Sequence, residues 1–340
     1  MLRNAISKLL DHKDLTSDES RQVMELIMSG EGSPVQIASY LTALRQKGET
    51  SSEILGSAQA MRDNAIRVDH HQSILFDNCG TGGDGAGTFN ISTTTSFVLA
   101  ACGLALAKHG NRSVSSKCGS ADLLAALGAN INLSPDQIGG CIDEVGIGFL
   151  FAVNLHPAMK NVASIRKELG FRTIFNLLGP LTNPAQATHQ LIGVFDGKYI
   201  ETVAAAAREL GIQRVMVVYN QGHIDELTTA SPNEICFASN GSLETTLLDP
   251  AEYGFSPCSL EELSGGTAEQ NAKITRAILN GEPGARRDTV LLNAGGALKV
   301  AERVDSIQDG IRLAEEAIDS GRAARKLNAF IQFTNGFGNA

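Results

Sequence analysis

The sequence has no tryptophan, few aromatic residues and no hydrophobic run long enough to span a membrane. Its most apolar stretch, residues 97–107, is well short of the ~20 residues that a membrane-spanning helix requires. The N-terminal segment carries Arg3 and Lys8 among its apolar positions, and no small-residue cleavage site follows it. We therefore expect neither a signal peptide nor a membrane partner.

Cysteine and clustered charge are also scarce. The six cysteines show neither a CxxC motif nor a Cys/His spacing of the kind that binds zinc, so the sequence favours neither a zinc site nor a disulfide framework. We expect reduced thiols and a cytoplasmic location. Lysine and arginine are scattered and the formal net charge is -9, which argues against a nucleic-acid surface and favours a small-molecule partner.

The N-terminal part of the chain has a helical pattern. Residues 1–68 place apolar side chains at three- and four-residue spacing and show no strand pattern, so we expect three or four helices there. So few helices cannot easily close a core of their own, and we expect a small lobe that packs against something larger. Gly30 and Gly48 supply helix stops, and three residue pairs match the capping box that begins a helix: Thr16 with Glu19, Ser33 with Gln36, and Thr50 with Glu53.

The rest of the chain alternates short apolar runs with helical segments, which is typical of βα units and a mainly parallel sheet. Asn240-Gly241 predicts a hairpin and hence an antiparallel extension of that sheet. Residues 156–184 break the rhythm and could cross back to the helical lobe. The predicted fold class is α/β, with a small all-helical domain and a larger α/β domain around a mainly parallel central sheet. The predicted strands are 74–76, 104–107, 147–152, 191–194, 215–219, 233–239 and 242–249.

The stretch DNCGTGGDGAGTFNISTTT, residues 77–95, lies between a predicted strand and a predicted helix. Glycines let the backbone bring several N–H groups to one ligand, and the following helix contributes its positive N-terminal dipole. Hydroxyl side chains are interleaved with the five glycines. An ordinary Gly-rich loop is the alternative, but this density of glycine, hydroxyl and Asp84 favours binding of phosphate or pyrophosphate.

A second polar segment, KHGNRSVSSKCGSAD at residues 108–122, follows the predicted strand 104–107. Ligands of open α/β sheets bind outside the carboxyl ends of the strands, where this segment and the Gly-rich stretch would both emerge. Lys108, Arg112 and Lys117 bring positive charge to phosphate oxygens. A solvated basic loop is the alternative.

Asp225 and Glu226 follow the predicted strand 215–219. One or two carboxylates together with substrate phosphates commonly hold Mg²⁺. Acidic pairs are also frequent on surfaces, and only the predicted phosphate site nearby favours the metal interpretation.

Arg166 could bind a carboxylate with its planar guanidinium, although most helix arginines are solvated or ion-paired. Lys160, Lys167 and Arg172 offer the same charge, and spacing cannot choose among them. His109 and His156 are by default structural histidines.

Taken together, residues 80–93, 108–122 and 156–184 and the Asp225-Glu226 pair closely resemble the anthranilate phosphoribosyltransferases. The resemblance spans nearly the whole chain. It implies a nucleoside phosphorylase-like fold, with a helical domain of residues 1–68 and a returning segment near 160–186. Residues 69–340 would form the α/β domain that binds phosphoribosyl pyrophosphate. It also implies a homodimer that uses Mg²⁺ in tryptophan biosynthesis.

The same resemblance implies roles for individual residues. Lys108, Arg166, Asp225 and Glu226 would be catalytic, with Ser92, Asp225 and Glu226 around Mg²⁺. Gly80, Asn111 and Arg166 would bind anthranilate. Phosphoribosyl pyrophosphate would be held by Gly80, Gly83, Asp84, Thr88, Asn90, Ile91, Ser92, Thr93, Lys108, His109, Gly110, Asn111, Arg112, Ser113, Val114, Ser115, Ser116 and Ser120.

Two departures from the family are mild. Cys118 stands where a serine is typical, and Val153 where a proline is common. Neither removes a charge or a predicted ligand. The alternatives are a pyrimidine nucleoside phosphorylase of the same fold, against which Arg166 argues, and a non-catalytic nucleic-acid-binding relative, against which the acidic pair and the net charge argue.

Overall fold

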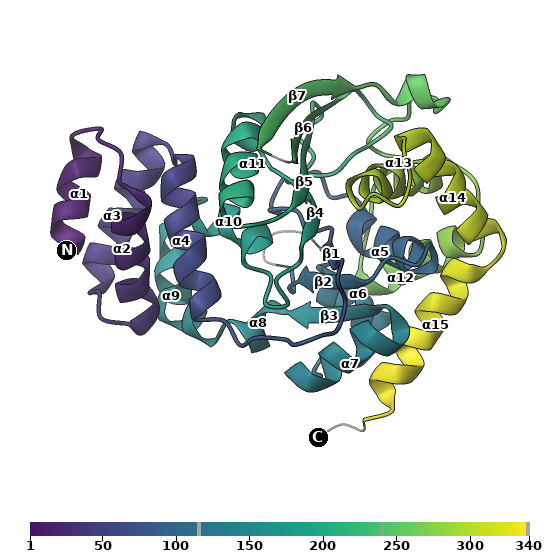
Figure 1. Ribbon diagram of the computed structural model, residues 1–340, viewed down its shortest axis with the longest axis horizontal. Helices are drawn as coiled ribbons and strands as arrows, with labels where there is room; N and C mark the ends of the chain where they lie inside the picture. Colours follow the sequence, from purple (N-terminus) through teal and green to yellow (C-terminus); the bar gives the residue numbers. More distant parts are fainter. Residues whose placement is uncertain (114–116, 240, 338–340) are drawn as a thin grey trace.

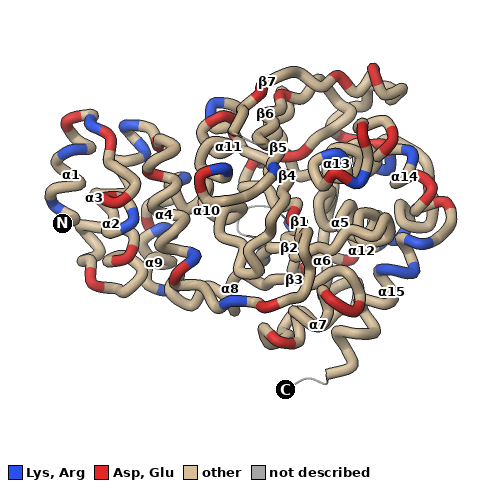
Figure 2. Tube along the Cα trace, in the orientation of Figure 1, with Lys and Arg blue, Asp and Glu red and all other residues tan. Residues whose placement is uncertain are grey.

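The computed structural model describes residues 1–113, 117–239 and 241–337. Figure 1 shows a bundle of helices at one end of the long axis and a larger α/β part at the other. The positions of Lys and Arg and of Asp and Glu are interspersed along the described trace (Figure 2), in keeping with the scattered charges of the sequence. No helix within the described ranges is long and apolar enough to cross a membrane.

Four helices form from the N-terminal residues, as predicted. Thr16 and Thr50 make reciprocal capping boxes with Glu19 and Glu53, whereas Ser33 accepts the Gln36 N–H and donates its hydroxyl to Gln36 Oε1. Gly30 ends the second helix with a left-handed φ of 79°. The helices are α1 (Leu2–Leu10), α2 (Ser17–Ser29), α3 (Pro34–Lys47) and α4 (Ser51–Asp63).

The segment that breaks the βα rhythm returns to these helices. It contains α8 (Ala152–Leu155), η1 (Pro157–Met159), α9 (Lys160–Leu169), α10 (Phe175–Leu178) and η2 (Gly179–Thr182). α9 packs on α2 and α3, and the Asn161 side-chain amide donates to the Met28 carbonyl at 2.7 Å. α10 packs on α4. Residues from the middle of the chain therefore complete the helical bundle.

The central sheet has seven strands in the order β3-β2-β1-β4-β5-β6-β7. The first five pair in parallel, and β6 and β7 form the predicted antiparallel extension, although residue 240 of the expected hairpin lies outside the described residues. The strands are β1 (Phe76–Asp77), β2 (Leu106–Gly110), β3 (Ile147–Phe151), β4 (His189–Gly193), β5 (Arg214–Asn220), β6 (Asn233–Ser239) and β7 (Ser242–Leu248).

The ends of several strands differ from the prediction, as in β1, β2 and β4, and the difference in β2 bears on the site. β2 covers residues 106–110 rather than 104–107, so Lys108 and His109 lie inside the strand and not in the loop that follows it. The prediction was wrong because both side chains are polar, yet both are buried. Pairing of Lys108 with Phe149 and of His109 with Leu150 of β3 extends the strand through them.

Helices cover both faces of the sheet. Leu191 and Met216 point to a core shared with α5 and α13, whereas Ile192 and Val217 point to a core shared with α11 and the helical bundle. The strands are therefore apolar on both sides, as expected for a parallel sheet between layers. The remaining elements are α5 (Ile91–Ala101), α6 (Ser120–Ala126), α7 (Pro135–Val145), η3 (Gly197–Tyr199), α11 (Ile200–Glu209), η4 (Pro250–Tyr253), α12 (Ala268–Leu279), α13 (Ala285–Val300), α14 (Ile307–Asp319) and α15 (Arg322–Asn335).

Candidate active site

The strand order reverses beside β1. Connections from β1 run to β2 and β3 on one side, and the later strands β4 and β5 lie on the other. The Gly-rich stretch leaves the carboxyl end of β1, which is the place where open α/β sheets bind ligands. The predicted loop between strand and helix is thus located at the switch point of the sheet.

Close packing against Asp225 explains the first glycine of this loop. A Cβ built on Gly80 would lie 2.4 Å from Asp225 Oδ2, so any larger residue would displace the carboxylate. The Gly82 N–H donates to the same oxygen at 2.6 Å, and the Asp225 N–H donates to Asp84 Oδ2 at 3.4 Å. Gly82 and Gly83 have φ of 67° and 71°, which glycine adopts without steric cost.

Glu226 joins the loop to the start of α5. Its Oε1 accepts the Ser92 N–H at 3.1 Å, within the first turn of that helix. Burial raises the pKa of Glu226 to about 7, although Lys108 and Ser92 act in the opposite direction. Burial also raises the pKa of Asp225 well above its ordinary value, and the nearby Asp84 and Glu226 add to the effect.

These acidic groups and Ser92 fit a hard divalent cation. Carboxylate and hydroxyl oxygens are the donors that Mg²⁺ prefers. Burial disfavours the charged form of both carboxylates, the nearby Asp84 adds to this, and the raised pKa values express that cost. A bound cation would relieve it.

Lys108 supplies the positive charge of the site. Its side chain comes from β2 and is buried, and Nζ donates to the carbonyls of Asn78 and His109 at 3.0 and 3.1 Å. The ammonium therefore lies between the ends of β1 and β2. The positive charge of Lys108 lowers the pKa of Glu226, against the larger effect of burial.

The segment after β2 is ordered by Ser120 and Asp122. The Asn111 N–H donates to Ser120 Oγ at 3.1 Å, and a Cβ on Gly110 would lie 2.1 Å from the same atom. Asp122 pairs with Arg112 at 2.9 Å and accepts the Ser113 N–H at 3.0 Å. Val114, Ser115 and Ser116 of the prediction lie outside the described residues.

Other residues of the predicted phosphate site form its framework. Asn90 donates to the Cys118 carbonyl at 3.1 Å and accepts from Asn271 at 2.8 Å. Thr88 pairs with Ser264 in an isolated bridge. Ile91 and Thr93 are buried in the first turn of α5.

Arg166 lies on α9, in the helical part of the molecule. Its guanidinium packs 5.2 Å from the ring centre of Phe175 on α10, and burial lowers its pKa. Gly80 and Asn111 follow β1 and β2. The three residues predicted to bind anthranilate therefore come from both parts of the molecule.

A pair of buried histidines is a feature that sequence reasoning treated as structural. The rings of His109 and His156 are 5.2 Å apart, and His109 Nδ1 bonds to the Gly179 carbonyl at 3.1 Å. Burial lowers the pKa of His109 to about 3 and that of His156 to about 4, so both rings stay neutral. Their Nε2 atoms have no hydrogen-bond partner in the described part of the chain.

Asp77 and Asn183 form a second buried connection that the sequence did not reveal. The Asn183 amide donates to Asp77 Oδ2 and to the Ala107 carbonyl, both at 2.8 Å, while Asp77 Oδ1 accepts the His109 N–H at 3.2 Å. Asp77, Cys79 and His109 bring potential metal-ligand atoms within 4.8 Å of one another. Burial raises the pKa of the Cys79 thiol to about 12, however, which favours a structural role.

Known proteins resemble the whole chain. Residues 72–324 match the family described as "Glycosyl transferase family, a/b domain", and residues 3–65 match "Glycosyl transferase family, helical bundle domain". The chain is 51% identical to the anthranilate phosphoribosyltransferase of Acetivibrio thermocellus, over 99% of this chain and 98% of that protein. The enzyme of the same name from Symbiobacterium thermophilum is 48% identical over 98% of each chain.

Solved structures of enzymes with the same name resemble the fold of this chain. The anthranilate phosphoribosyltransferase of Thermus thermophilus superposes with a TM-score of 0.92 at 43% identity, covering 97% of this chain and 99% of that one. The Saccharomyces cerevisiae enzyme in complex with PRPP and Mg superposes with a TM-score of 0.90 at 26% identity, over 98% of each chain.

Proposed function

The chain belongs to the anthranilate phosphoribosyltransferase family of glycosyl transferases, and from this membership we infer the chemistry of its site. The protein is an anthranilate phosphoribosyltransferase of tryptophan biosynthesis. The anthranilate nitrogen forms a bond to C1 of the ribose, and the bond from C1 to the pyrophosphate oxygen breaks. Pyrophosphate leaves with the bonding electrons, and the amine loses a proton.

One observation supports the assignment of this chemistry to particular residues. The Gly-rich loop, Asp225, Glu226 and the first turn of α5 converge at the switch point of the sheet, where Gly82 N–H meets Asp225 and Ser92 N–H meets Glu226. The two N–H groups hold the carboxylates, so oxygen ligands suited to a cation lie beside the Gly-rich loop that we propose for pyrophosphate. A transferase with a pyrophosphate leaving group needs both.

We propose Ser92, Asp225 and Glu226 as ligands of Mg²⁺. When bound, Mg²⁺ neutralises charge on the pyrophosphate oxygens. Asp225 and Glu226 would be held ready by the Gly82 and Ser92 N–H groups. The cost of burying both charges would favour a divalent cation at this site.

Lys108 would stabilise the negative charge that develops on the departing oxygen, because its ammonium is already fixed by two carbonyls. Arg166 would orient the anthranilate carboxylate, together with Gly80 and Asn111. The amine of anthranilate is already a nucleophile and needs no strong base. Positioning of the substrates and exclusion of water would therefore supply the remaining rate enhancement. We propose that phosphoribosyl pyrophosphate contacts Gly80, Gly83, Asp84, Thr88, Asn90, Ile91, Ser92, Thr93, His109, Gly110, Asn111, Arg112, Ser113 and Ser120 as well as Lys108; Val114, Ser115 and Ser116 complete this set.

We further propose that residues 1–68 and the returning segment 160–186 act as one helical domain, and residues 69–340 as the domain that binds phosphoribosyl pyrophosphate. The packing of α9 on α2 and α3 supports this division. A homodimer in the cytoplasm is the proposed working state of the protein.

The function is tested by fluorescence of anthranilate. The signal should fall only when phosphoribosyl pyrophosphate and Mg²⁺ are both present, and background is low because the chain contains no tryptophan. Omission of Mg²⁺ with added chelator is the control. An unchanged anthranilate signal, with cleavage of thymidine or uridine by inorganic phosphate, would identify a nucleoside phosphorylase instead.

A further inference from the structure

Arg172 connects the returning segment to the Gly-rich loop. It lies between α9 and α10, and its Nη2 donates to the carbonyl of Gly83. Its guanidinium also lies 4.4 Å from the ring centre of Phe195. A planar cation can stack on a ring and donate along its edge at the same time.

The loop needs such an anchor, because glycines do not hold a backbone conformation by themselves. Gly82 and Gly83 both have positive φ, and rotation of their peptides meets little steric resistance. Asp225 fixes one peptide by accepting the Gly82 N–H. Arg172 fixes the peptide between Gly83 and Asp84, two peptides further along, by binding the Gly83 carbonyl. In a trans peptide the C=O and N–H point in opposite directions, so this bond also turns the Asp84 N–H away from Arg172.

Phe195 is itself tied to the loop and to the helical bundle. Its N–H donates to Thr81 Oγ1 at 3.0 Å, and the Thr81 N–H donates to the Gly193 carbonyl at 2.9 Å. Its ring packs edge-on against Tyr199, with centroids 5.4 Å apart. The Tyr199 hydroxyl donates to Glu49 Oε2 at 2.7 Å, at the junction of α3 and α4. The aromatic platform under Arg172 is therefore rigid.

We propose that Arg172 is a positioning residue that holds the Gly82–Asp84 backbone in the conformation that binds phosphoribosyl pyrophosphate. This inference rests on the proposed function of the loop. Arg172 acts through the Gly83 carbonyl, and the stack on Phe195 sets the direction of its guanidinium. Charge alone is not sufficient, because a lysine cannot both stack on the ring and present a planar donor to the carbonyl.

The test compares Arg172→Gln, Arg172→Lys and Phe195→Leu with the full-length wild-type protein. Affinity for phosphoribosyl pyrophosphate in Mg²⁺ is measured by calorimetry, and KM is measured for each substrate. Arg208→Gln is the matched control, because Arg208 also donates to a glycine carbonyl, Gly241, at 2.9 Å, but on the β6–β7 side of the sheet. Melting temperatures establish that every variant is folded.

We expect both Arg172 variants to bind phosphoribosyl pyrophosphate roughly ten-fold more weakly, the size of one charge-assisted hydrogen bond. KM for that substrate should rise in parallel, while KM for anthranilate stays within about two-fold, since one loop contact is affected. Phe195→Leu should also weaken binding of phosphoribosyl pyrophosphate, but by less than the Arg172 variants do. Arg208→Gln should keep the wild-type affinity for phosphoribosyl pyrophosphate and the wild-type KM values for both substrates.

Three results would overturn the inference: full affinity in Arg172→Gln, full recovery in Arg172→Lys, or an equal rise of both KM values. Wild-type protein that binds phosphoribosyl pyrophosphate without consuming anthranilate would overturn the proposed function instead. In that case the calorimetric comparison of Arg172 with Arg208 variants still decides the role of Arg172.

Discussion

At the scale of single residues, burial of charge sets the chemistry of this site. Asp225 and Glu226 accept the N–H groups of Gly82 and Ser92, and burial raises the pKa of both carboxyls. The residues next to Asp225 and Glu226 in the sequence do not predict that these carboxylates would be buried. Burial raises the pKa values of both carboxylates, and such perturbed groups mark a candidate functional site.

Substitution of the acidic pair tests its role in metal binding. Asp225→Asn with Glu226→Gln should lower kcat/KM by about 100-fold or more at limiting Mg²⁺, because the site loses its main electrostatic groups. Turnover measured across a range of Mg²⁺ concentrations checks this. Glu261→Gln with Glu262→Gln, an exposed pair, is the control. An unchanged Mg²⁺ dependence would remove Asp225 and Glu226 from the mechanism.

The two buried histidines make the stability of the protein depend on pH. Their pKa values lie below the ordinary value of histidine, so the native state keeps both rings neutral while the unfolded chain takes up protons. The free energy of unfolding that depends on these neutral rings is fully present above about pH 6.5 and is lost as the pH falls toward 4. Urea unfolding at several pH values should show a steeper acid loss in wild type than in His156→Gln.

The exposed His12 provides the comparison for that experiment. His12→Gln should keep the wild-type acid slope. If His156→Gln and wild type lose stability in parallel between about pH 6.5 and pH 4, the burial of His156 does not govern the acid sensitivity.

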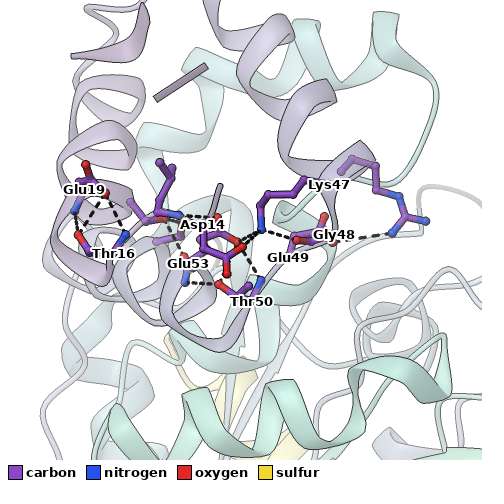
Figure 3. A network of polar contacts seen from close by, with 12 residues as sticks. Asp14, Thr16, Glu19, Lys47, Gly48, Glu49, Thr50 and Glu53 are labelled. Atoms are coloured by element: carbon purple, nitrogen blue, oxygen red, sulfur yellow. Dashed lines mark hydrogen bonds and ion pairs between the residues drawn. The ribbon is translucent and has the colours of Figure 1, made fainter. Parts of the chain in front are cut away.

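At the scale of elements, the same capping motif contributes differently to the stability of the protein in different helices. Figure 3 shows the two capping boxes of the bundle, with Glu19 at the start of α2 and Glu53 at the start of α4. Glu53 is fully buried, accepts the N–H groups of Leu15 and Thr50, and pairs with Lys47 at 3.0 Å. Glu19 also forms an ion pair, with Lys8, but it is partly exposed, so the same sequence signal marks a partly exposed ion pair in one helix and a buried one in the other.

Glu53→Gln should destabilise the protein by about 3 kcal/mol, because the amide group would face a backbone N–H and leave a buried lysine short of its partner. Glu19→Gln, at the partly exposed cap, should cost about 0.5 kcal/mol. Denaturant unfolding measures both. Equal effects of the two substitutions would show that burial of the Glu53 cluster adds nothing to the cap.

At the scale of the whole molecule, one hydrophobic core joins the helical bundle to the sheet. Leu41 of α3, Val162 of α9, Val203 of α11 and Val217 of β5 belong to one continuous cluster. Arg62 adds polar ties from α4, since its guanidinium donates to the carbonyls of Leu181 and Leu210 at 2.7 and 3.1 Å. The two parts seen in Figure 1 should thus unfold together.

Calorimetry should show a single cooperative transition for the whole chain. Leu41→Ala in the bundle and Leu124→Ala in the core on the other face of the sheet should each lower the free energy of unfolding by about 3 kcal/mol. Both should shift the entire endotherm. A Leu41→Ala endotherm that splits, with only part of it moving, would mean that the bundle unfolds independently.

Local rules of sequence were sufficient for much of the fold. Capping boxes, apolar spacing and the hairpin signal act over three or four residues, and they predicted the four N-terminal helices, the alternation of strands and helices and the antiparallel extension. The glycines and hydroxyls of residues 77–95 predicted a ligand loop, and the loop lies at the switch point of the sheet. Family resemblance, not spacing, named the substrates.

Contacts between distant residues were decided only by the tertiary structure. Lys108 and His109 belong to β2 because β3 pairs with them, and the buried polar ties of Asp77 to Asn183 and of Arg172 to Gly83 join residues about a hundred positions apart. Such contacts depend on which elements pack together, and that choice is made by burial of apolar surface across the whole chain. The sequence by itself determined that a Gly-rich loop would lie between a strand and a helix, because its turn residues act locally; the packing determined which side chains hold that loop in place.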